Sequence, residues 1–178
     1  LDDGKAMYAY PFAGYWKDVG TIASLWEENM DLLGDKPEFD LYDKNWRIFS
    51  RTSARPPQFV GEDAKIHGSM MSEGCEIYGT VINSVLSAGV VVEKGATVRD
   101  SVILGNVTVK ADATVDYSVV DSDTVISKEA TVGKSIAEAK GITLLGGGLT
   151  VPAGVSVPDG VICGKEMLAE LSAKGGNA

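Results

Sequence analysis

A short repeat dominates residues 92–137, which read VEKGATVRDSVILGNVTVKADATVDYSVVDSDTVISKEATVGKSIA. The triplet Ala-Thr-Val begins at residues 96, 113 and 130, and a Ser-led apolar group begins at Ser101, Ser118 and Ser135, so both recur every 17 residues. A fixed period this short, in a chain rich in valine and glycine, is typical of a solenoid in which successive turns of chain stack on one another.

The same pattern continues towards the N-terminus. One turn, or coil, has an apolar residue, a second one six positions later, and a Ser-led apolar pair three positions after that. The second coil is two residues shorter, which predicts that one of its corners is cut short. The first five coils are predicted at Val60, Ile66 and 69–71; Ile77 and 84–86; Val92, Val98 and 101–103; Val109, Val115 and 118–120; and Ile126, Val132 and 135–137.

The repeat is interrupted after the fifth predicted coil. Each Ser-led group is followed eight residues later by the first apolar residue of the next coil, but eight residues after Ser135 stands Thr143. The pattern resumes eight residues late, which predicts an insertion at 141–148 with the glycine run 146–148 as its turn. A sixth coil is then predicted at Val151, Val157 and 160–162.

A six-residue unit per face predicts a three-sided prism, so the fold class is mainly β, a single-stranded parallel β-helix built from hexapeptide repeats in about six coils. Aliphatic side chains inside each coil would supply roughly 1.5–3 kcal/mol apiece on burial. The corners of such a prism crowd side chains towards its axis and favour small residues there. Small or slim residues precede many of the apolar positions: Ala64, Cys75, Ala96, Ala113, Thr124 and Ala130.

The residues before the repeat predict one helix. Residues 7–12 alternate aromatic positions and are expected to be extended. A helix then starts after Thr21, a good N-cap, and stops at Gly34. This helix needs a partner surface, because about 34 residues cannot form a core alone. Its apolar stripe consists of Ile22, Leu25, Trp26, Met30 and Leu33.

The segments that flank the coils are expected to be a connector and a cap. Residues 38–59 form the connector, in which 46–49 are predicted as a short strand and Trp46 as an apolar plug between domains. Residues 165–171 predict a short helix capping the last coil, because an open coil exposes unpaired backbone groups. Residues 172–178 are expected to be disordered.

Composition restricts the partners. The formal net charge of −9 argues against binding to nucleic acid or to an anionic membrane surface. No apolar run approaches the roughly 20 residues of a membrane helix. The two cysteines, Cys75 and Cys163, lack a C-x-x-C spacing and fit small buried apolar residues in a reducing compartment, so a cytoplasmic location is expected.

Chemistry is sparse within the coils. Hexapeptide β-helices serve as acyltransferases or as scaffolds attached to another catalytic domain, and an acyltransferase needs a histidine base. The only histidine, His67, is interpreted as a solvent-facing coil residue. No catalytic residue is therefore assigned in this chain, and substrate-binding residues stay unknown. The acidic residues of the coils are interpreted as a solvated face: Glu93, Asp100, Asp112 and Asp121.

One motif carries a family resemblance. Residues 14–21 read Gly-Tyr-Trp-Lys-Asp-Val-Gly-Thr, and with the helix at 22–33 they resemble the end of the catalytic domain of bacterial glucose-1-phosphate adenylyltransferase (ADP-glucose pyrophosphorylase). The resemblance covers residues 7–136. It also includes the linker Asn45–Ser50, the turn Arg55–Gln58, the segment Glu73–Cys75 and residues 100–103.

This resemblance implies both the fold and the activity of a longer parent enzyme. It implies a left-handed β-helix, and a homo-oligomer that is a tetramer in the family. The parent is a transferase that makes ADP-glucose and pyrophosphate from ATP and glucose 1-phosphate for glycogen biosynthesis, with Mg²⁺ as cofactor. The aspartate of the Trp-x-Asp-x-Gly-Thr motif, a Mg²⁺ ligand in the family, corresponds to Asp18.

The chain is accordingly expected to be a C-terminal piece of that enzyme, inactive alone and without a bound cofactor. We expect a remnant of an α/β nucleotidyltransferase domain at 1–34, a linker at 35–58, the β-helix at 59–164, and a capping helix with a disordered tail at 165–178. Two alternatives remain open, a hexapeptide-repeat acyltransferase and a non-catalytic structural subunit of the same pathway.

Overall fold

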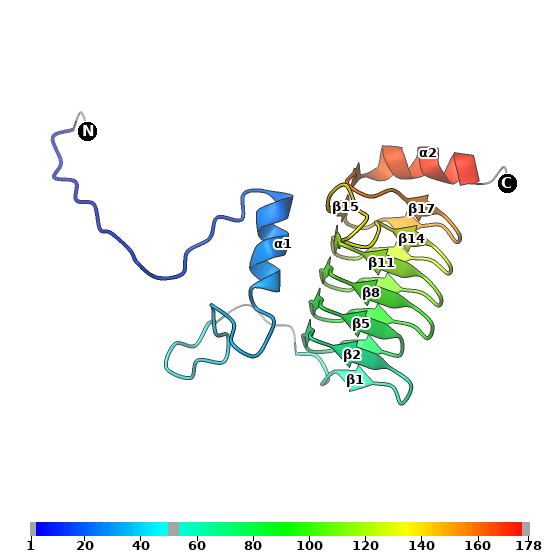
Figure 1. The fold of residues 1–178 in the computed structure, drawn as a ribbon, viewed down its shortest axis with the longest axis horizontal. Coiled ribbons are helices and arrows are strands. Elements are labelled where there is room, and N and C mark those ends of the chain that lie inside the picture. Colours follow the sequence, from blue (N-terminus) through cyan, green and yellow to red (C-terminus); the bar gives the residue numbers. More distant parts are fainter. Residues whose placement is uncertain (1–2, 50–53, 176–178) are drawn as a thin grey trace.

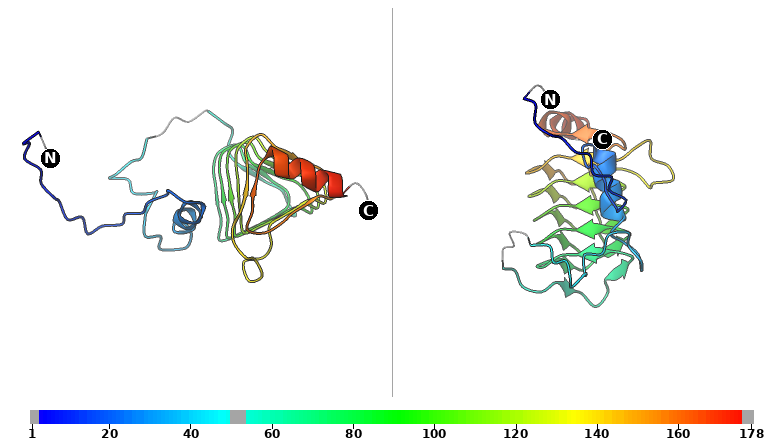
Figure 2. Two further views of the ribbon diagram at one scale, coloured as in Figure 1. Left: turned by 90° about the horizontal axis from the view of Figure 1, so that it is seen from above. Right: turned by 90° about the vertical axis from the view of Figure 1, so that its left-hand side faces the viewer.

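The computed structural model describes residues 3–49 and 54–175, and its main body is a parallel β-helix of six coils (Figure 1). Its strands form three six-stranded sheets, and every pairing in them is parallel. Seen along the stack, the coils enclose a triangular section (Figure 2). The predicted mainly β, three-sided fold is confirmed.

Each coil contributes one short strand to each sheet. Sheet A contains β1 (Phe59–Val60), β4 (Glu76–Ile77), β7 (Val91–Val92), β10 (Thr108–Val109), β13 (Val125–Ile126) and β16 (Thr150–Val151). Sheet B contains β2 (Lys65–His67), β5 (Thr80–Ile82), β8 (Thr97–Arg99), β11 (Thr114–Asp116), β14 (Thr131–Val132) and β17 (Ser156–Val157). Sheet C contains β3 (Met70–Met71), β6 (Val85–Leu86), β9 (Val102–Ile103), β12 (Ser118–Val120), β15 (Thr143–Leu145) and β18 (Ile162–Cys163).

The core is a column of apolar side chains stacked in register along the prism. Because side chains alternate across a strand, one residue of each strand points inward and its neighbour outward. The small residues predicted at the corners lie inside as well, fully buried except for the partly buried Ala64. The inward row of sheet B, for example, is Ile66, Val81, Val98, Val115, Val132 and Val157.

The short corner predicted for the second coil lies between β4 and β5. Only Tyr78 and Gly79 connect these strands. A side chain at Gly79 would come within 2.4 Å of the carbonyl oxygen of Ala96 in the next coil, so this corner lies directly against its neighbour and requires glycine.

The fifth coil corrects the sequence prediction. Its third strand is β15, which pairs in register with β12, rather than residues 135–137. The additional residues therefore lie inside the fifth coil, between β14 and β15, and project from a corner (Figure 2). The insertion is thus not at 141–148, and the glycines 146–148 form an ordinary corner. Thr143 takes the place of the expected serine, and Val151 follows it by the regular eight residues.

The sixth coil is also shifted, by one residue. The sequence pattern placed its third strand at 160–162, but Leu145 pairs with Cys163. The turn Pro158-Asp159-Gly160 takes up one more residue than the equivalent corners. Because a one-residue shift reverses the side chains of a strand, Cys163 faces the core and Ile162 is 69% exposed.

Helix α1 (Ile22–Met30) packs on the outside of sheet C. Thr21 caps it through a capping box with Ser24, as its N-cap role predicted. The outward residues of sheet C are apolar, and Val102 and Val119 are only 1% exposed although they lie outside the central core. The partner surface that the helix required is therefore the outer face of sheet C, and Figure 1 shows α1 along the side of the stack. The helix ends four residues before Gly34.

Two segments before the coils differ from the prediction. Residues 7–12 form no strand, and the chain extends away from the body here (Figure 1). Residues 46–49 also form no strand, and Trp46 is 79% exposed, so its predicted role as a plug is wrong. The physical reason is that a strand needs a paired neighbour, and within the described residues these segments have none.

Helix α2 (Lys165–Gly175) covers the last coil, as predicted (Figure 1). Leu168 is buried, and Met167 and Leu171 pack against the core. The helix continues past Leu171, so the expectation of disorder is wrong for residues 172–175, whereas 176–178 lie outside the described residues.

Candidate functional site

The 14–21 loop, which bears Asp18, runs directly into α1. Asp18 is exposed, and its Oδ1 accepts a hydrogen bond from the backbone N–H of Gly20 at 3.0 Å. This contact closes a small turn in which the carboxylate organises its own backbone. The loop ends at Thr21, whose side chain accepts from the backbone N–H of Ser24 at 3.1 Å.

Two further residues of this loop bind one carboxylate at the other end of the helix. Asp31 Oδ2 accepts hydrogen bonds from the Lys17 ammonium at 2.5 Å and from the Tyr15 hydroxyl at 3.1 Å. Glu27 lies 3.8 Å from Lys17. The hydrogen bond from Lys17 lowers the pKa of Asp31, and the same bond raises the pKa of Lys17. Burial, followed by the hydrogen bond to Asp31, raises the pKa of Tyr15.

Trp26 attaches α1 to the coils. Its indole Nε1–H donates to the carbonyl oxygen of Asp100 at 2.7 Å, and its ring meets Tyr117 edge to face at a centroid distance of 5.0 Å. Asp100 and Tyr117 occupy the same corner in successive coils, and both have a positive φ. Trp26 therefore attaches α1 to the row of corners at one edge of sheet C.

The Asp18 carboxylate has the chemistry of a Mg²⁺ ligand, but the residues around it do not complete a metal site. Mg²⁺ prefers oxygen ligands in octahedral geometry and is held in proteins by one or two carboxylates together with substrate phosphates. Within residues 3–49 and 54–175 there is no group of three or more His, Cys, Asp or Glu residues that could hold a metal ion. The described residues therefore do not form a metal site by themselves, and Asp18 is a single exposed carboxylate.

The other predicted candidates stay apart from this loop. His67 is exposed at the end of β2. Cys75 and Cys163 are free and buried, as predicted, and burial raises the pKa of both thiols. They are accordingly poor nucleophiles.

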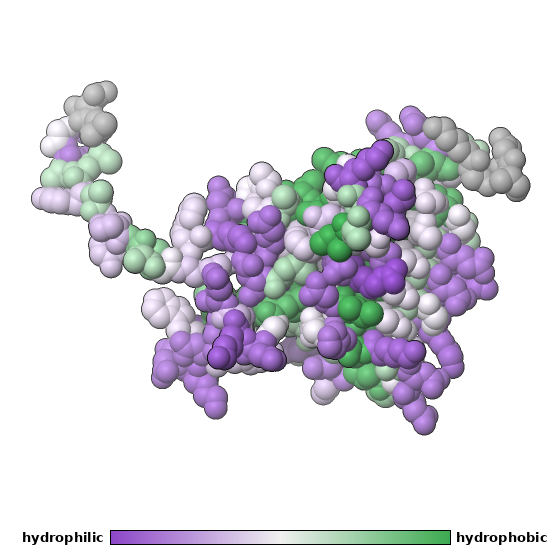
Figure 3. Space-filling view, in the orientation of Figure 1, coloured by the Kyte–Doolittle hydropathy of each residue, from purple (hydrophilic) through white to green (hydrophobic). Residues whose placement is uncertain are grey.

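The coil carboxylates are distributed over different corners instead of one solvated face. Asp100 accepts from the Asn83 amide at 2.7 Å, and Asp121 accepts from its neighbouring backbone N–H. Glu93 accepts from the Lys110 ammonium at 2.8 Å and from the backbone N–H of Ala111 at 3.0 Å. The contacts of Asp100 and Glu93 tie successive coils together. Figure 3 shows that hydrophilic residues cover much of the visible face.

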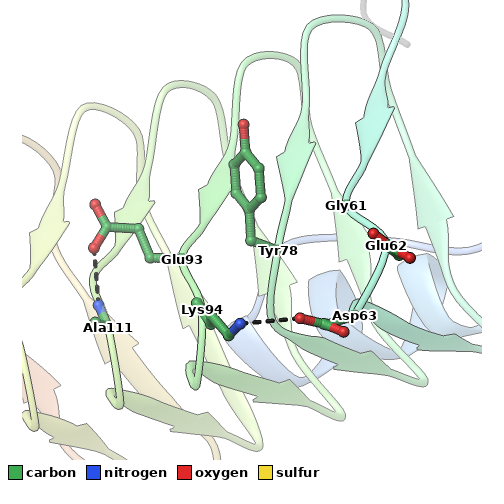
Figure 4. A pocket seen from close by; sticks show the side chains of 7 residues that line it. All are labelled: Gly61, Glu62, Asp63, Tyr78, Glu93, Lys94 and Ala111. Atoms are coloured by element: carbon green, nitrogen blue, oxygen red, sulfur yellow. Dashed lines mark hydrogen bonds and ion pairs between the residues drawn. The ribbon is translucent and has the colours of Figure 1, made fainter.

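A notch of about 360 Å³ lies where the second coil is cut short (Figure 4). Tyr78 stands at its middle, and Lys94 bridges it by an ion pair of 2.9 Å to Asp63, two coils away. This bridge lowers the pKa of Asp63. The notch exists because this corner is two residues shorter than the equivalent corners of the other coils. Lys94, the lysine among its lining residues, is already paired with Asp63, so the coil geometry explains the notch.

Sequence reasoning missed Asp31 and the contact between Trp26 and the coils. Asp31 is 14 residues from Lys17, and Trp26 is 74 residues from Asp100, so no local spacing connects them. One signal was available. The third strand of every coil carries adjacent apolar residues, as in Val102-Ile103, whereas most strands of the other two sheets pair an apolar residue with polar ones, as in Thr97-Val98-Arg99. Adjacent apolar residues indicate a sheet that is covered on both faces.

Both the coils and the 14–21 loop match known protein families. The family model described as "GlmU-like, C-terminal hexapeptide" matches residues 55–152, more than half of the chain. The chain belongs to this hexapeptide family. A second model, "Nucleotidyl transferase", matches residues 1–35, which include the 14–21 loop and α1.

Curated relatives of this hexapeptide protein carry the name glucose-1-phosphate adenylyltransferase. The relative from Clostridioides difficile (strain 630) is 55% identical over 98 residues, which are 55% of this chain and 25% of the relative. Those from Bacillus mycoides (strain KBAB4) and Clostridium perfringens (strain SM101) are 56% and 58% identical over 98 residues, or 26% and 25% of their lengths. The family resemblance is confirmed, although the aligned region spans only about a quarter of these relatives.

No helix within residues 3–49 and 54–175 is long and apolar enough to cross a membrane.

Proposed function

We propose that this chain is the C-terminal β-helix part of a glucose-1-phosphate adenylyltransferase and carries the last segment of its nucleotidyltransferase fold. The observation that supports this is the order of the two family matches, a nucleotidyl transferase segment at 1–35 followed by hexapeptide coils at 55–152. Relatives that match 98 residues of this chain at about 55% identity bear that enzyme name.

In this proposal the coils are a scaffold for assembly and regulation, and chemistry takes place outside them. The reaction joins a phosphate oxygen of glucose 1-phosphate to the α-phosphorus of ATP and releases pyrophosphate. Asp18 contributes one carboxylate to a Mg²⁺ site, and its other ligands come from the part of the relatives that the matched region does not span. Bound Mg²⁺ would neutralise phosphate charge during the transfer.

The contacts of the 14–21 loop fit this role for Asp18. A metal-binding carboxylate must be held in a fixed place. The preceding residue, Lys17, is bound by Asp31, and the Asp18 carboxylate itself accepts a hydrogen bond from the backbone N–H of Gly20. The enzyme is proposed to be a homo-oligomer, with ATP and glucose 1-phosphate as its substrates.

The experiment is a chimera in which this chain replaces the matching C-terminal part of the Clostridioides difficile relative. We expect the chimera to release pyrophosphate from ATP and glucose 1-phosphate with Mg²⁺, and the isolated 178-residue chain to release none. Asp18→Asn should abolish this activity. The matched control is Asp43→Asn, because Asp43 is also exposed and also accepts a backbone N–H two residues ahead, at 2.8 Å.

Three results would contradict the proposal. Pyrophosphate release by the isolated chain would show that the coils are more than a scaffold. A folded, assembled but inactive chimera would show that this β-helix does not serve the enzyme. Full activity of the Asp18→Asn chimera would remove Asp18 from the metal site.

A further inference from the structure

The 14–21 loop is fixed to both ends of the same helix. At the N-terminal end of α1, Thr21 and Ser24 cap each other through reciprocal backbone contacts of 3.0 and 3.1 Å. At the C-terminal end, Asp31 binds Lys17 and Tyr15. Lys17 and Asp31 are about a third exposed or less, so solvent screens this ion pair less than it would a fully exposed one. The position of α1 therefore determines the position of the loop.

The helix is in turn fixed to the coils. Nine residues give α1 a length of about 13.5 Å, which matches three coils at about 4.8 Å each. Three outward residues of sheet C have low exposure along this length, Val85, Val102 and Val119. The Trp26 indole supplies a directional contact on this surface, its 2.7 Å hydrogen bond to Asp100, which fixes where along the stack the helix sits.

A continuous set of contacts thus joins the coils to Asp18. It runs from Asp100 to Trp26, along α1 to Asp31, and from Asp31 to Lys17, the residue next to Asp18. We propose that Asp31 is a positioning residue that holds the Asp18 carboxylate in a fixed place relative to the β-helix, with Trp26 as its attachment to the coils. The catalytic meaning of this arrangement rests on the proposed function, because only there does Asp18 bind a metal.

The first experiment uses the 178-residue chain and needs no activity. Hydrogen exchange followed by mass spectrometry is compared between the wild type, Asp31→Asn and the control Asp43→Asn. We expect Asp31→Asn to speed exchange in residues 15–20 by about threefold to tenfold, the factor for losing one charge-assisted contact of roughly 1 kcal/mol. Exchange in the coils and their melting temperature should not change, and Asp43→Asn should resemble the wild type.

The role of Trp26 is tested by a substitution that keeps the aromatic ring. Trp26→Phe removes the N–H donor to Asp100 while leaving a ring against Tyr117. We expect faster exchange in residues 15–20 here too, by a smaller factor. Trp46→Phe is the matched control, because Trp46 is exposed.

The second experiment measures the chimera as a function of Mg²⁺ concentration. Positioning of a metal ligand predicts that Asp31→Asn raises the Mg²⁺ concentration for half-maximal rate by several-fold, with a much smaller change in kcat at saturating Mg²⁺. A purely structural role would lower the active fraction, and so kcat, without changing the Mg²⁺ dependence.

The outcomes separate the two proposals. Unchanged exchange in residues 15–20 of Asp31→Asn, or equal acceleration throughout the coils, would overturn the positioning role. An unchanged Mg²⁺ dependence in an active Asp31→Asn chimera would overturn it as well. An inactive wild-type chimera would overturn the proposed function alone, and hydrogen exchange would still decide whether Asp31 holds the loop.

Discussion

Replacing Leu145 by alanine tests the register of the fifth coil. Leu145 is completely buried and lies between Val120 and Cys163 of the adjacent coils. In the alternative register that the 17-residue period suggests, residues 135–137 would form this strand and Leu145 would lie in an insertion. Leu145→Ala therefore distinguishes two placements of the same segment.

The expected magnitude follows from the burial. Leucine to alanine removes three carbon atoms, worth about 2.4 kcal/mol at roughly 0.8 kcal/mol each, and the cavity left behind adds to this. We expect a loss of about 3 kcal/mol in the free energy of unfolding for Leu145→Ala. Ile136→Ala is the matched control, because Ile136 is 48% exposed in the insertion and its truncation should stay within about 0.5 kcal/mol.

Urea unfolding at 25 °C, followed by circular dichroism, measures both variants. Because stacked coils can unfold in parts, hydrogen exchange should locate the loss to the fifth and sixth coils. A larger loss of stability for Ile136→Ala than for Leu145→Ala would refute this register, since residues 135–137 would then form the third strand, with Ile136 at the covered position that Val119 takes in the fourth coil.

Two further predictions concern the corners and the loop. Ala113 is completely buried at an inner corner, so Ala113→Leu should lower the free energy of unfolding by ~1–3 kcal/mol in a urea titration. The exposed control Ala137→Leu should have almost no effect. Equal effects of the two substitutions would contradict the inward placement of Ala113. The contact of Asp31 with Lys17 and Tyr15 should persist at neutral pH and be lost only on acidification, because the pKa of Asp31 is lowered from its ordinary value of 3.8 and the stabilisation disappears as pH falls through that lowered value. An NMR titration of the Asp31 carboxyl carbon with a midpoint at or above 3.8 would contradict this.

The coils could be predicted because their signal is local and repeated. Each inward position, such as Val98, Val115 and Val132, occurs in the same surroundings one period later, so several copies support one assignment. The predictions for the fifth and sixth coils were wrong because the 17-residue period is interrupted there. Thr143 can replace serine at the start of β15 because its hydroxyl makes a comparable contact with the next coil. It accepts from the backbone N–H of Gly160 at 3.2 Å, as the Ser101 hydroxyl accepts from that of Ser118 at 3.1 Å.

The loop and helix were only partly predictable. The N-cap at Thr21 was readable, because its partner Ser24 is three residues away. The contacts of Asp31 could not be predicted, since they depend on how the loop folds back along α1. For Trp46 the apolar cluster at 46–49 predicted burial, but no surface within the described residues covers this side chain.

The sequence by itself determined the β-helix, its short second coil and its small inner corners, because stacking in register requires the same residue types at each period. It also carried the 14–21 motif, which lies inside the segment matched by the nucleotidyl transferase family. Only the tertiary structure decided where the insertion lies, which face α1 covers, and how Asp31 and Trp26 connect Asp18 to the coils. These features depend on contacts between residues far apart in the chain, and such contacts leave no period to read.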